Sequence, residues 1–220
     1  LHGNASVVNV LGDTASIQQG IHLATDAGGA HVYVAAGNYA ENINIYKSLT
    51  LQGVGGPSQP MLFGTTPGGT VVLVSANNVT VDGFDIVGQT VPWFIPSLYA
   101  IKADNVSGLT LSNNNISGPL GAGIVLNNVS DAVVAHNAIS TALTGILVNG
   151  GSQLGLFCNT ILGTVTGIKL TGTDHASLIG NSVGGSLLNA IDVASSTFTQ
   201  IIGNDVTGAG IDGIKVTNSS

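Results

Sequence analysis

Apolar and polar residues alternate along most of the chain, and one polar position returns at a nearly fixed interval. Asparagine occupies that position at spacings of 23, 22, 22 and 23 residues. An aliphatic residue stands three positions before each asparagine, and another stands two positions after it. The repeated asparagines are Asn114, Asn137, Asn159, Asn181 and Asn204. A fixed period near 22 residues predicts one supersecondary unit that is stacked many times.

The second half of each repeat also alternates with a period of two, which decides between two repeat architectures. The first half, as in residues 106–116, fits the template of the leucine-rich repeat. In the second half of the repeat a leucine-rich horseshoe would have a helix or a 3₁₀ turn. Here the second half predicts another strand, as in residues 123–127 (Gly-Ile-Val-Leu-Asn) and 145–149 (Gly-Ile-Leu-Val-Asn). We therefore predict an all-β fold, a parallel β-helix with at least two strands in each coil.

The repeated asparagine has a structural interpretation in such a fold. Equivalent residues of stacked coils lie about 4.8 Å apart, the spacing of neighbouring strands. An inward asparagine can then bond the amide of the next asparagine and the backbone of the turn, which satisfies polar groups that the bend would otherwise bury. We predict an internal ladder that runs from Asn114 to Asn204.

The first forty residues differ from the repeats. Ser16 and Gln19 fit a capping box, with Ser16 as the N-cap and Gln19 reaching back to it. Ile17 and Ile21 then fall on one helical face, and Gly28 follows as a helix stop. Strand-like alternation resumes after this glycine. We therefore expect a short helix that covers the otherwise open end of the stacked sheet.

A single domain accounts for the 220 residues, because the repeat runs without a break. Residues 1–40 are expected to form an N-terminal cap and the first strands, and residues 41–220 to form the coils. The sequence stops partway through a coil, at residues 214–220. Because an open sheet edge invites pairing, we expect either further coils after Ser220 or association between copies, end to end or side by side.

Three segments resemble a known group of proteins. Residues 16–43, which include Val-Tyr-Val-Ala-Ala-Gly-Asn-Tyr, and residues 47–53 (Lys-Ser-Leu-Thr-Leu-Gln-Gly) resemble the N-terminal region of right-handed parallel β-helix proteins of the pectin-lyase-like superfamily. Residues 78–86 are similar to the repeat consensus of that group. The resemblance covers nearly the whole chain and implies a right-handed β-helix. It does not decide the activity, because the superfamily contains lyases, hydrolases, epimerases, phage tailspikes, adhesins and non-catalytic proteins.

The signatures of the superfamily's enzymes are missing from the sequence. Pectate lyases use calcium-bound acidic residues with an arginine base, and this chain has no arginine. The polygalacturonase-like motifs Asn-Thr-Asp, Asp-Asp, Gly-His-Gly and Arg-Ile-Lys are absent, as is the Asp-Pro-His signature of alginate epimerases. No catalytic residue is therefore carried over from these families.

Composition narrows the classes of partner. Charged residues make up 7% of the chain, which has four basic residues and a net charge of −7. Without a basic patch there is no electrostatic source for binding a phosphate backbone, so we expect no nucleic-acid partner. Apolar residues never run unbroken for the roughly 18 positions that a membrane-spanning helix needs. Cys158 is the only cysteine, which excludes an internal disulfide. Richness in Gly, Asn, Ser and Thr favours a secreted or cell-surface protein.

Asp82, Asp85 and Asp104 are the acidic residues that could serve an enzyme. Asp82 and Asp85 flank a Gly-Phe pair and could be imagined as an acid/base pair. Aspartate at such a place in this repeat also fits a turn or an outward strand position, which would leave no catalytic residue. The histidines and Cys158 lack ligand spacings such as Cys-x-x-Cys or His-x-x-x-His, so we expect neither a metal site nor a cofactor.

The repeat is interrupted once. Ile86 and Ile116 are 30 residues apart, so about seven extra residues bulge out between them. The insertion holds Trp93, the only tryptophan, together with Phe94 and Tyr99. Loops on a rigid scaffold often carry binding residues, and aromatic faces can stack on sugar rings. The alternatives are a ligand-binding loop and a small satellite core that folds back over the sheet.

The register predicts other columns of residues. His136 and Cys158 fall in one column, at a turn position that also accepts Asn and Gly, which favours a tolerant turn over a Cys-His catalytic pair. His175 lies two coils from Asp131, about 9.6 Å by the stacking distance, too far for a hydrogen bond. A further column either exposes an apolar stripe or tucks it inward: Ser112, Ala135, Phe157, Ile179 and Ile202.

Asn-x-Ser/Thr sequons occur six times. They arise readily where asparagine-rich turns precede Val-Ser or Ile-Ser strands, so the motif alone does not imply glycosylation. The sequons begin at Asn4, Asn78, Asn105, Asn115, Asn128 and Asn218.

The sequence thus leads to one functional hypothesis and one rival. The first is a non-catalytic, secreted or surface-exposed β-helix that acts as a structural or adhesive module and binds a glycan or other copies of itself. The rival is a polysaccharide-active lyase, hydrolase or epimerase with an acidic groove near Trp93, whose candidates are Asp82, Asp85 and Asp104.

Overall fold

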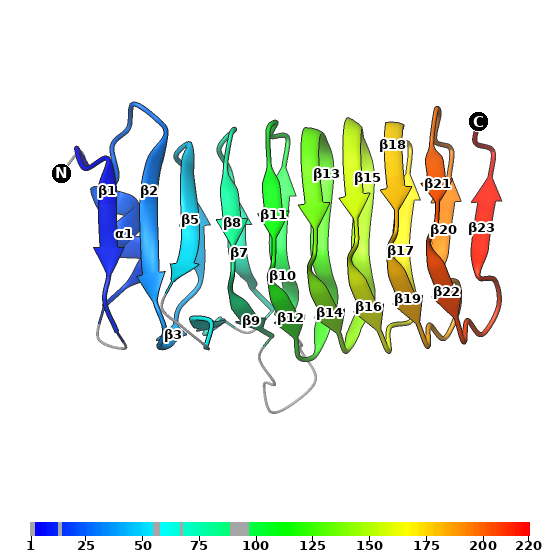
Figure 1. Ribbon diagram of the computed structural model, residues 1–220, viewed down its shortest axis with the longest axis horizontal. Helices are drawn as coiled ribbons and strands as arrows, with labels where there is room; N and C mark the ends of the chain where they lie inside the picture. The colour runs from blue at the N-terminus through cyan, green and yellow to red at the C-terminus, as the bar shows by residue number, and fades with distance from the viewer. Residues whose placement is uncertain (1–2, 13–14, 55–57, 67, 89–96) are drawn as a thin grey trace.

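The protein is a solenoid of stacked β-strand coils in a computed structural model that describes residues 3–12, 15–54, 58–66, 68–88 and 97–220. Successive coils follow one another along a single axis from the N-terminus to the C-terminus (Figure 1). Neighbouring strands pair in parallel and in register, as between Ile124 and Ile146 or between Ile139 and Ile161. The predicted right-handed parallel β-helix is confirmed, and the leucine-rich horseshoe is excluded.

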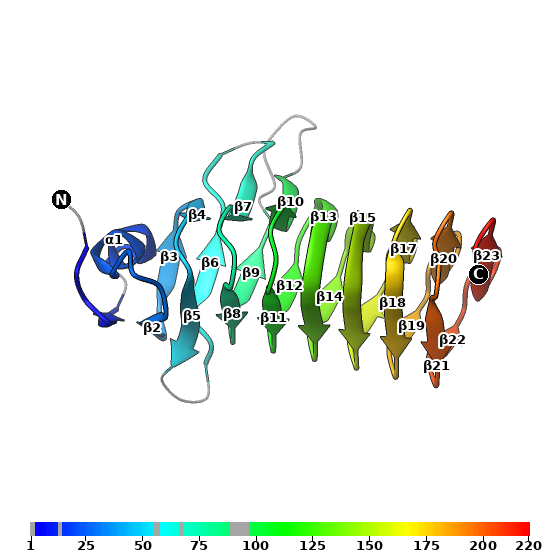
Figure 2. The ribbon, with the colours of Figure 1, turned by 90° about the horizontal axis from the view of Figure 1, so that it is seen from above.

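The strands of the described residues form three faces, which the chain visits in the order A, B, C (Figure 2). Face A stacks β4 (Ile43–Ile45), β7 (Thr70–Val74), β10 (Ser97–Asp104), the first parts of β13 (Leu120–Ala135) and β15 (Ala142–Phe157), β17 (Thr166–Thr171), β20 (Ile191–Ala194) and β23 (Ile214–Thr217). Face B stacks β1 (Val7–Val10), β2 (Ala30–Ala35), β5 (Leu49–Val54), β8 (Thr80–Asp82), β11 (Thr110–Ser112), the last parts of β13 and β15, β18 (Asp174–Ile179) and β21 (Gln200–Ile202). Face C stacks β3 (Asn38–Ala40), β6 (Met61–Phe63), β9 (Asp85–Val87), β12 (Asn115–Ser117), β14 (Ala138–Ser140), β16 (Thr160–Leu162), β19 (Ser182–Gly184) and β22 (Asp205–Thr207).

The alternation that predicted the strands also builds the core. Along β13 and β15, for example, Ile124, Leu126, Ile146 and Val148 are fully buried and stack on their partners in the next coil. Of the residues between them, Leu147 is half-buried and Val125 is buried. Because each coil offers its inward residues to both neighbours, the core is one continuous column along the axis.

The faces are separated by corner residues whose backbone lies in the left-handed region of φ and ψ. These corners also explain why glycine recurs in the repeat. Four positions in each regular coil have φ between +49° and +99°. Only Gly adopts this conformation freely, and Asn and Asp tolerate it better than other residues do. The four columns are Asn105, Asn128, Gly150, Gly172, Ser195, Asn218; then Asp131, Gln153, His175, Phe198; then Asn113, His136, Cys158, Gly180, Gly203; and then Gly118, Thr141, Gly163, Gly185, Gly208.

Helix α1 (Ile17–Leu23) lies in the first coil, between β1 and β2. Ile17 and Ile21 are fully buried, as their shared face predicted. Ser16 is the N-cap and accepts a hydrogen bond from the backbone N–H of Gln19, which confirms half of the capping box. A residue of the following coil adds to the cap. The carboxylate of Glu41 accepts from the backbone N–H groups of Ile17 and Gln18 at 2.7 and 3.2 Å, which suits a helix N-terminus.

The helix also covers the edge of face A. Gln18 Nε2 donates to the carbonyl of Asn44 at 3.2 Å, and Gln18 Oε1 accepts from the Asn44 N–H at 2.7 Å. This side-chain amide therefore takes the place of a missing strand beside β4 and satisfies the edge that the first coil would otherwise leave open.

The expected helix stop at Gly28 is wrong. The helix ends at Leu23, and Ala24 is extended with ψ of 147°. Two sets of contacts take the chain out of the helix early. Ala24 forms a parallel bridge with Ala5, and Lys47 Nζ donates to the carbonyls of His22 and Ala24. Tertiary contacts thus override the local stop signal.

Candidate functional site

The three candidate acids lie on three different faces. Asp82 ends β8 on face B, Asp85 begins β9 on face C, and Asp104 ends β10 on face A. Asp82 and Asp85 stand on either side of the Gly83 corner, where φ is +78°. The structure therefore does not gather the three carboxylates into one constellation, and each has its own set of neighbours.

Asp82 bridges the coils before and after it. Gln52 Nε2 donates to Oδ2 at 3.2 Å, and Ser112 Oγ and Asn113 Nδ2 both donate to Oδ1 at 2.7 Å. Gln52, Asp82 and Ser112 are register partners on face B. An ionised carboxylate is an acceptor with room for several donors, so Asp82 links three stacked coils.

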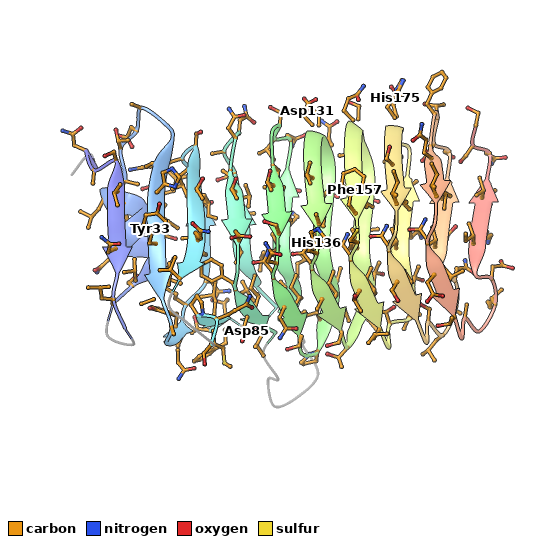
Figure 3. All side chains as sticks on the ribbon, in the orientation of Figure 1. Tyr33, Asp85, Asp131, His136, Phe157 and His175 are labelled. Carbon is orange, nitrogen blue, oxygen red and sulfur yellow. The ribbon has the colours of Figure 1, made fainter. Side chains whose placement is uncertain are left out.

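Asp85 lies in a shallow polar groove on face C, at the lower edge of the molecule in Figure 3. Asn115 Nδ2 donates to its Oδ1 at 3.0 Å, and its own backbone N–H donates to the carbonyl of Pro60. The groove is lined by Gly37, Asn38, Ser58, Gln59, Met61, Asp85 and Asn115. In this groove a candidate acid meets several amide side chains.

Asp104 begins a second polar column, on the outer surface of face A. Lys102 Nζ lies 2.7 Å from Oδ2, Asn127 Nδ2 donates to Oδ1 at 2.7 Å, and Asn149 Nδ2 donates in turn to Asn127 Oδ1 at 2.8 Å. Partial burial works to raise the pKa of Asp104. The hydrogen bonds from Lys102 and Asn127 and the charge of Lys102 outweigh it and hold that pKa below its usual value of 3.8. Asp104 is thus held as an ionised acceptor.

The predicted aromatic loop is only partly described. Trp93 and Phe94 lie outside the described residues. Tyr99 does not belong to a loop: it lies in β10, half-buried, and is paired with Thr70 and Ala122 on the adjoining strands. Strand β10 begins at Ser97, two residues before Tyr99.

The predicted asparagine ladder is confirmed. Each Nδ2 donates to the Oδ1 of the asparagine in the next coil at 2.9–3.0 Å, from Asn114 as far as Asn204. The same Oδ1 also accepts the backbone N–H of the preceding ladder residue at 2.9–3.1 Å. The second N–H of each Nδ2 reaches a backbone carbonyl, for example that of Val134 from Asn159 at 2.9 Å. Asn159 and Asn181 are fully buried, so the ladder satisfies the backbone of one corner in every coil.

Two shorter hydroxyl columns were missed by the sequence reasoning. Ser196 Oγ accepts from the N–H and the hydroxyl of Thr173 at 3.1 and 3.0 Å, and Ser219 Oγ accepts from the Ser196 N–H. Thr164 and Ser186 approach each other at 3.4 Å, and both are buried. The signal was the return of Ser or Thr at a spacing of 22 or 23 residues, but these residues are too common in the chain for two or three occurrences to stand out.

The column that contains Phe157 points outward. Ser112, Ala135 and Phe157 are register partners on face B, followed by Ile179 and Ile202. Phe157 and Ile179 are half-buried, whereas Ile202 is 53% exposed. The ring of Phe157 lies over Gly155, where an added Cβ would sit 2.3 Å from it. The alternative, in which these side chains turn inward, is therefore wrong, although Phe157 and Ile179 in the middle of the column are only partly exposed.

The corner columns carry the remaining reactive side chains. His136 and Cys158 occupy one corner with φ of +56° and +51°, in the column shared with Gly180 and Gly203, as a tolerant turn predicts. Asp131 and His175 are two coils apart in another corner column, with Gln153 between them (Figure 3).

The His175 corner forms a small exposed cluster. Its ring stacks on that of Phe198 with centroids 4.6 Å apart, and Nδ1 lies 2.9 Å from Asp174 Oδ2. Hydrogen bonds from Thr197 and His175 lower the pKa of Asp174, against a smaller opposing effect of burial. Within the described part of the chain, no group of three or more His, Cys, Asp or Glu residues is placed to hold a metal ion.

The fold can now be set beside known proteins. A family model described as the right-handed β-helix region matches residues 6–183 and, in a second match, residues 68–220. The chain belongs to the right-handed β-helix family.

One curated relative of this β-helix protein is a cell surface glycoprotein of Methanothermus fervidus. The two are 32% identical over 107 residues, which are 49% of this chain and 16% of the relative. The match therefore spans less than a fifth of the relative's length.

Solved structures show the same fold at low sequence identity. An alginate lyase from Paenibacillus sp. str. FPU-7 has a TM-score of 0.64 and 12% identity, over 96% of this chain and 99% of that one. A variant of a periplasmic alginate epimerase has a TM-score of 0.60 and 13% identity, over 97% of this chain and 54% of that one. These neighbours share the right-handed β-helix fold of this chain. In the described residues of this β-helix, no helix is long and apolar enough to span a bilayer.

Proposed function

We propose that this β-helix is a non-catalytic module, secreted or displayed at the cell surface, with a structural or adhesive role. The observation that carries the proposal is how the candidate acids are used. Asp82 and Asp104 each accept hydrogen bonds from the side chains of stacked neighbours, and with Asp85 they lie on three different faces. Acid/base cleavage of a glycan needs two groups that face one bond, whereas a stacked scaffold needs bridges between its coils.

Two observations support the location. The curated relative is a cell surface glycoprotein. The chain also has few charges and many Gly, Asn, Ser and Thr residues, which fits an extracellular environment. Residues 1–220 act in this proposal as a single β-helix domain.

A glycan or a second copy of the protein is the proposed partner. The apolar column that ends at Ile202 and the exposed ring of Phe198, which is 66% accessible, offer contact area on the C-terminal coils. Exposed apolar groups that gather on one surface favour association. The groove around Asp85 offers amides and a carboxylate instead, the groups that orient sugar hydroxyls.

The proposal is tested by a screen for degradation and epimerisation on pectic, alginate and related glycans. We expect no turnover above a heat-denatured sample. Turnover that is lost in Asp85→Ala but kept in Asp174→Ala would replace the scaffold with a polysaccharide-active enzyme. Asp174 is the matched control because it is exposed and lies far along the stack, in β18.

Binding without turnover is measured separately, by titrating glycans and by sedimentation of the protein alone. Affinity that falls in Trp93→Ala but not in Phe198→Ala would assign glycan binding to the inserted segment. A strictly monomeric protein that binds none of the glycans would contradict the adhesive role and leave only a structural one.

A further inference from the structure

The alternation of the strands exposes the reacting groups of the sequons. The asparagine and the hydroxyl residue of a sequon are two positions apart, so they face the same way whenever the middle residue faces the core. This is the case for four sequons, whose middle residues are all buried: Val79, Val106, Ile116 and Val129. Their asparagines are all exposed: Asn78, Asn105, Asn115 and Asn128.

Asn78 and Asn105 stand apart from the other two. Both lie at corners with φ of +54° and between strands, whereas Asn128, at a corner with φ of +51°, lies within β13. Within the described part of the chain, neither Nδ2 has a hydrogen-bond acceptor, and neither do the hydroxyls of Thr80 and Ser107. Ser107 and Asn105 line a shallow polar groove that is open to solvent, together with Asn128 and Ser130 of the next coil.

Asn115 and Asn128 have their amides engaged. Asn115 lies in β12, with paired strands on both sides, and its Nδ2 donates to the Asp85 carboxylate at 3.0 Å. Asn128 lies inside β13, and its Nδ2 donates to Asn105 Oδ1 at 2.9 Å. A transferase would have to break these bonds and distort a paired strand before it could reach either nitrogen.

We propose that Asn78 and Asn105 are N-glycosylation sites of the folded protein, and that Asn115 and Asn128 are shielded from modification. The donor would be an oligosaccharide on a lipid diphosphate. Asn Nδ2 forms a bond to C1 of the first sugar, and the C1–O bond to the diphosphate breaks. The lipid diphosphate leaves with the electron pair, and the amide proton passes to a base of the transferase. The inference rests only on the extracellular location in the proposed function, and it needs neither adhesion nor the absence of catalysis.

The test uses the purified, folded protein with membranes that contain an oligosaccharyltransferase and its lipid-linked donor. Glycopeptides are quantified by mass spectrometry, and peptides from the same protein serve as the unfolded reference. On the folded protein we expect occupancy of Asn78 and Asn105 to exceed that of Asn115 by at least about tenfold, since Asn115 must give up a bond to a charged acceptor. In the peptides this preference should disappear.

Variants distinguish the effect of the local structure on occupancy from the effect of the sequon motif. Asn78→Gln and Asn105→Gln should each remove one glycan, and Ser107→Ala should remove the glycan at Asn105 while keeping the asparagine. Asp85→Ala frees Asn115 Nδ2 and should raise occupancy there. Equal occupancy of Asn115 and Asn105 on the folded protein would overturn the proposal. So would unmodified Asn78 and Asn105 under conditions in which their peptides are modified. Neither result depends on whether the protein cleaves or binds a glycan.

Discussion

The early coils and the later coils fill the same corner in different ways. After the Gly83 corner the inward position holds Phe84, which is fully buried. In the next five coils the equivalent position holds asparagine, and the first of these, Asn114, accepts the Phe84 N–H through Oδ1 at 3.1 Å. An aromatic ring fills volume, whereas an asparagine both fills space and pairs the backbone of two coils. The ladder lets later coils repeat without a large side chain at each turn.

The two ends of the stack differ in whether their inward side chains are covered. In the first coil, Ile17 and Ile21 of α1 are fully buried, and Gln18 pairs with the edge of β4. In the last described coil, Ile214 and Val216 are 44% and 54% exposed, although their partners Ile191 and Val193 are fully buried. An inward position is therefore buried only when a neighbour covers it on both sides.

The strongest test of this contrast is Phe84→Ala. Removing a fully buried aromatic leaves a cavity, which costs about 3–5 kcal/mol of unfolding free energy. Urea denaturation measures the loss. The matched control is Phe198→Ala, which should change stability by less than about 0.5 kcal/mol because that ring is 66% exposed. Equal effects of the two changes would contradict the role assigned to Phe84.

The ladder is tested in its middle, by Asn159→Leu. The change leaves the amides of Asn137 and the carbonyl of Val134 without their partner, which costs about 1–3 kcal/mol. A thermal melt should show a lower Tm. Asn149→Leu is the control, because Asn149 belongs to the outer column and is exposed. An unchanged Tm for Asn159→Leu would refute the ladder as a source of stability.

The smallest effect is expected from the outer column, through Asp104→Asn. The pKa of Asp104 is lowered in the folded protein, so its contribution is present above the unfolded value of 3.8 and is lost as the pH falls through the lower folded value. The contribution is about 0–1 kcal/mol, as for other exposed ion pairs. Stability of the two proteins should differ at pH 7 and converge as the pH falls below 3.8. A difference that grows on acidification would reverse the assigned sign.

Sequence reasoning succeeded where a position repeats in register. The columns of Asn159, Cys158 and Phe157 were each predicted with the correct register, because a constant period translates directly into stacking, although the direction of the Phe157 column was left open. Sequence reasoning failed where a single contact joins two positions that are not part of the repeat. Glu41 caps α1 from about one coil away, and the early end of that helix depends on Lys47, so neither could be read from local signals.

For the candidate site, the sequence named the residues but could not say which would meet. Asp82 and Asp85 are three positions apart, yet one corner sends them to different faces. The same limit applied to the sequons, which are alike as motifs but differ in whether Nδ2 is free or bonded to a neighbouring coil. Only the register across coils supplies those partners.

The sequence by itself determined the β-helix, its coil length and its asparagine ladder, because periodic burial and periodic hydrogen bonding leave a periodic pattern in the residues. The tertiary structure decided which faces the acids occupy, which amides remain free and how α1 ends. These depend on corner angles and on contacts between residues more than twenty positions apart, and single contacts of that kind leave no repeat to detect.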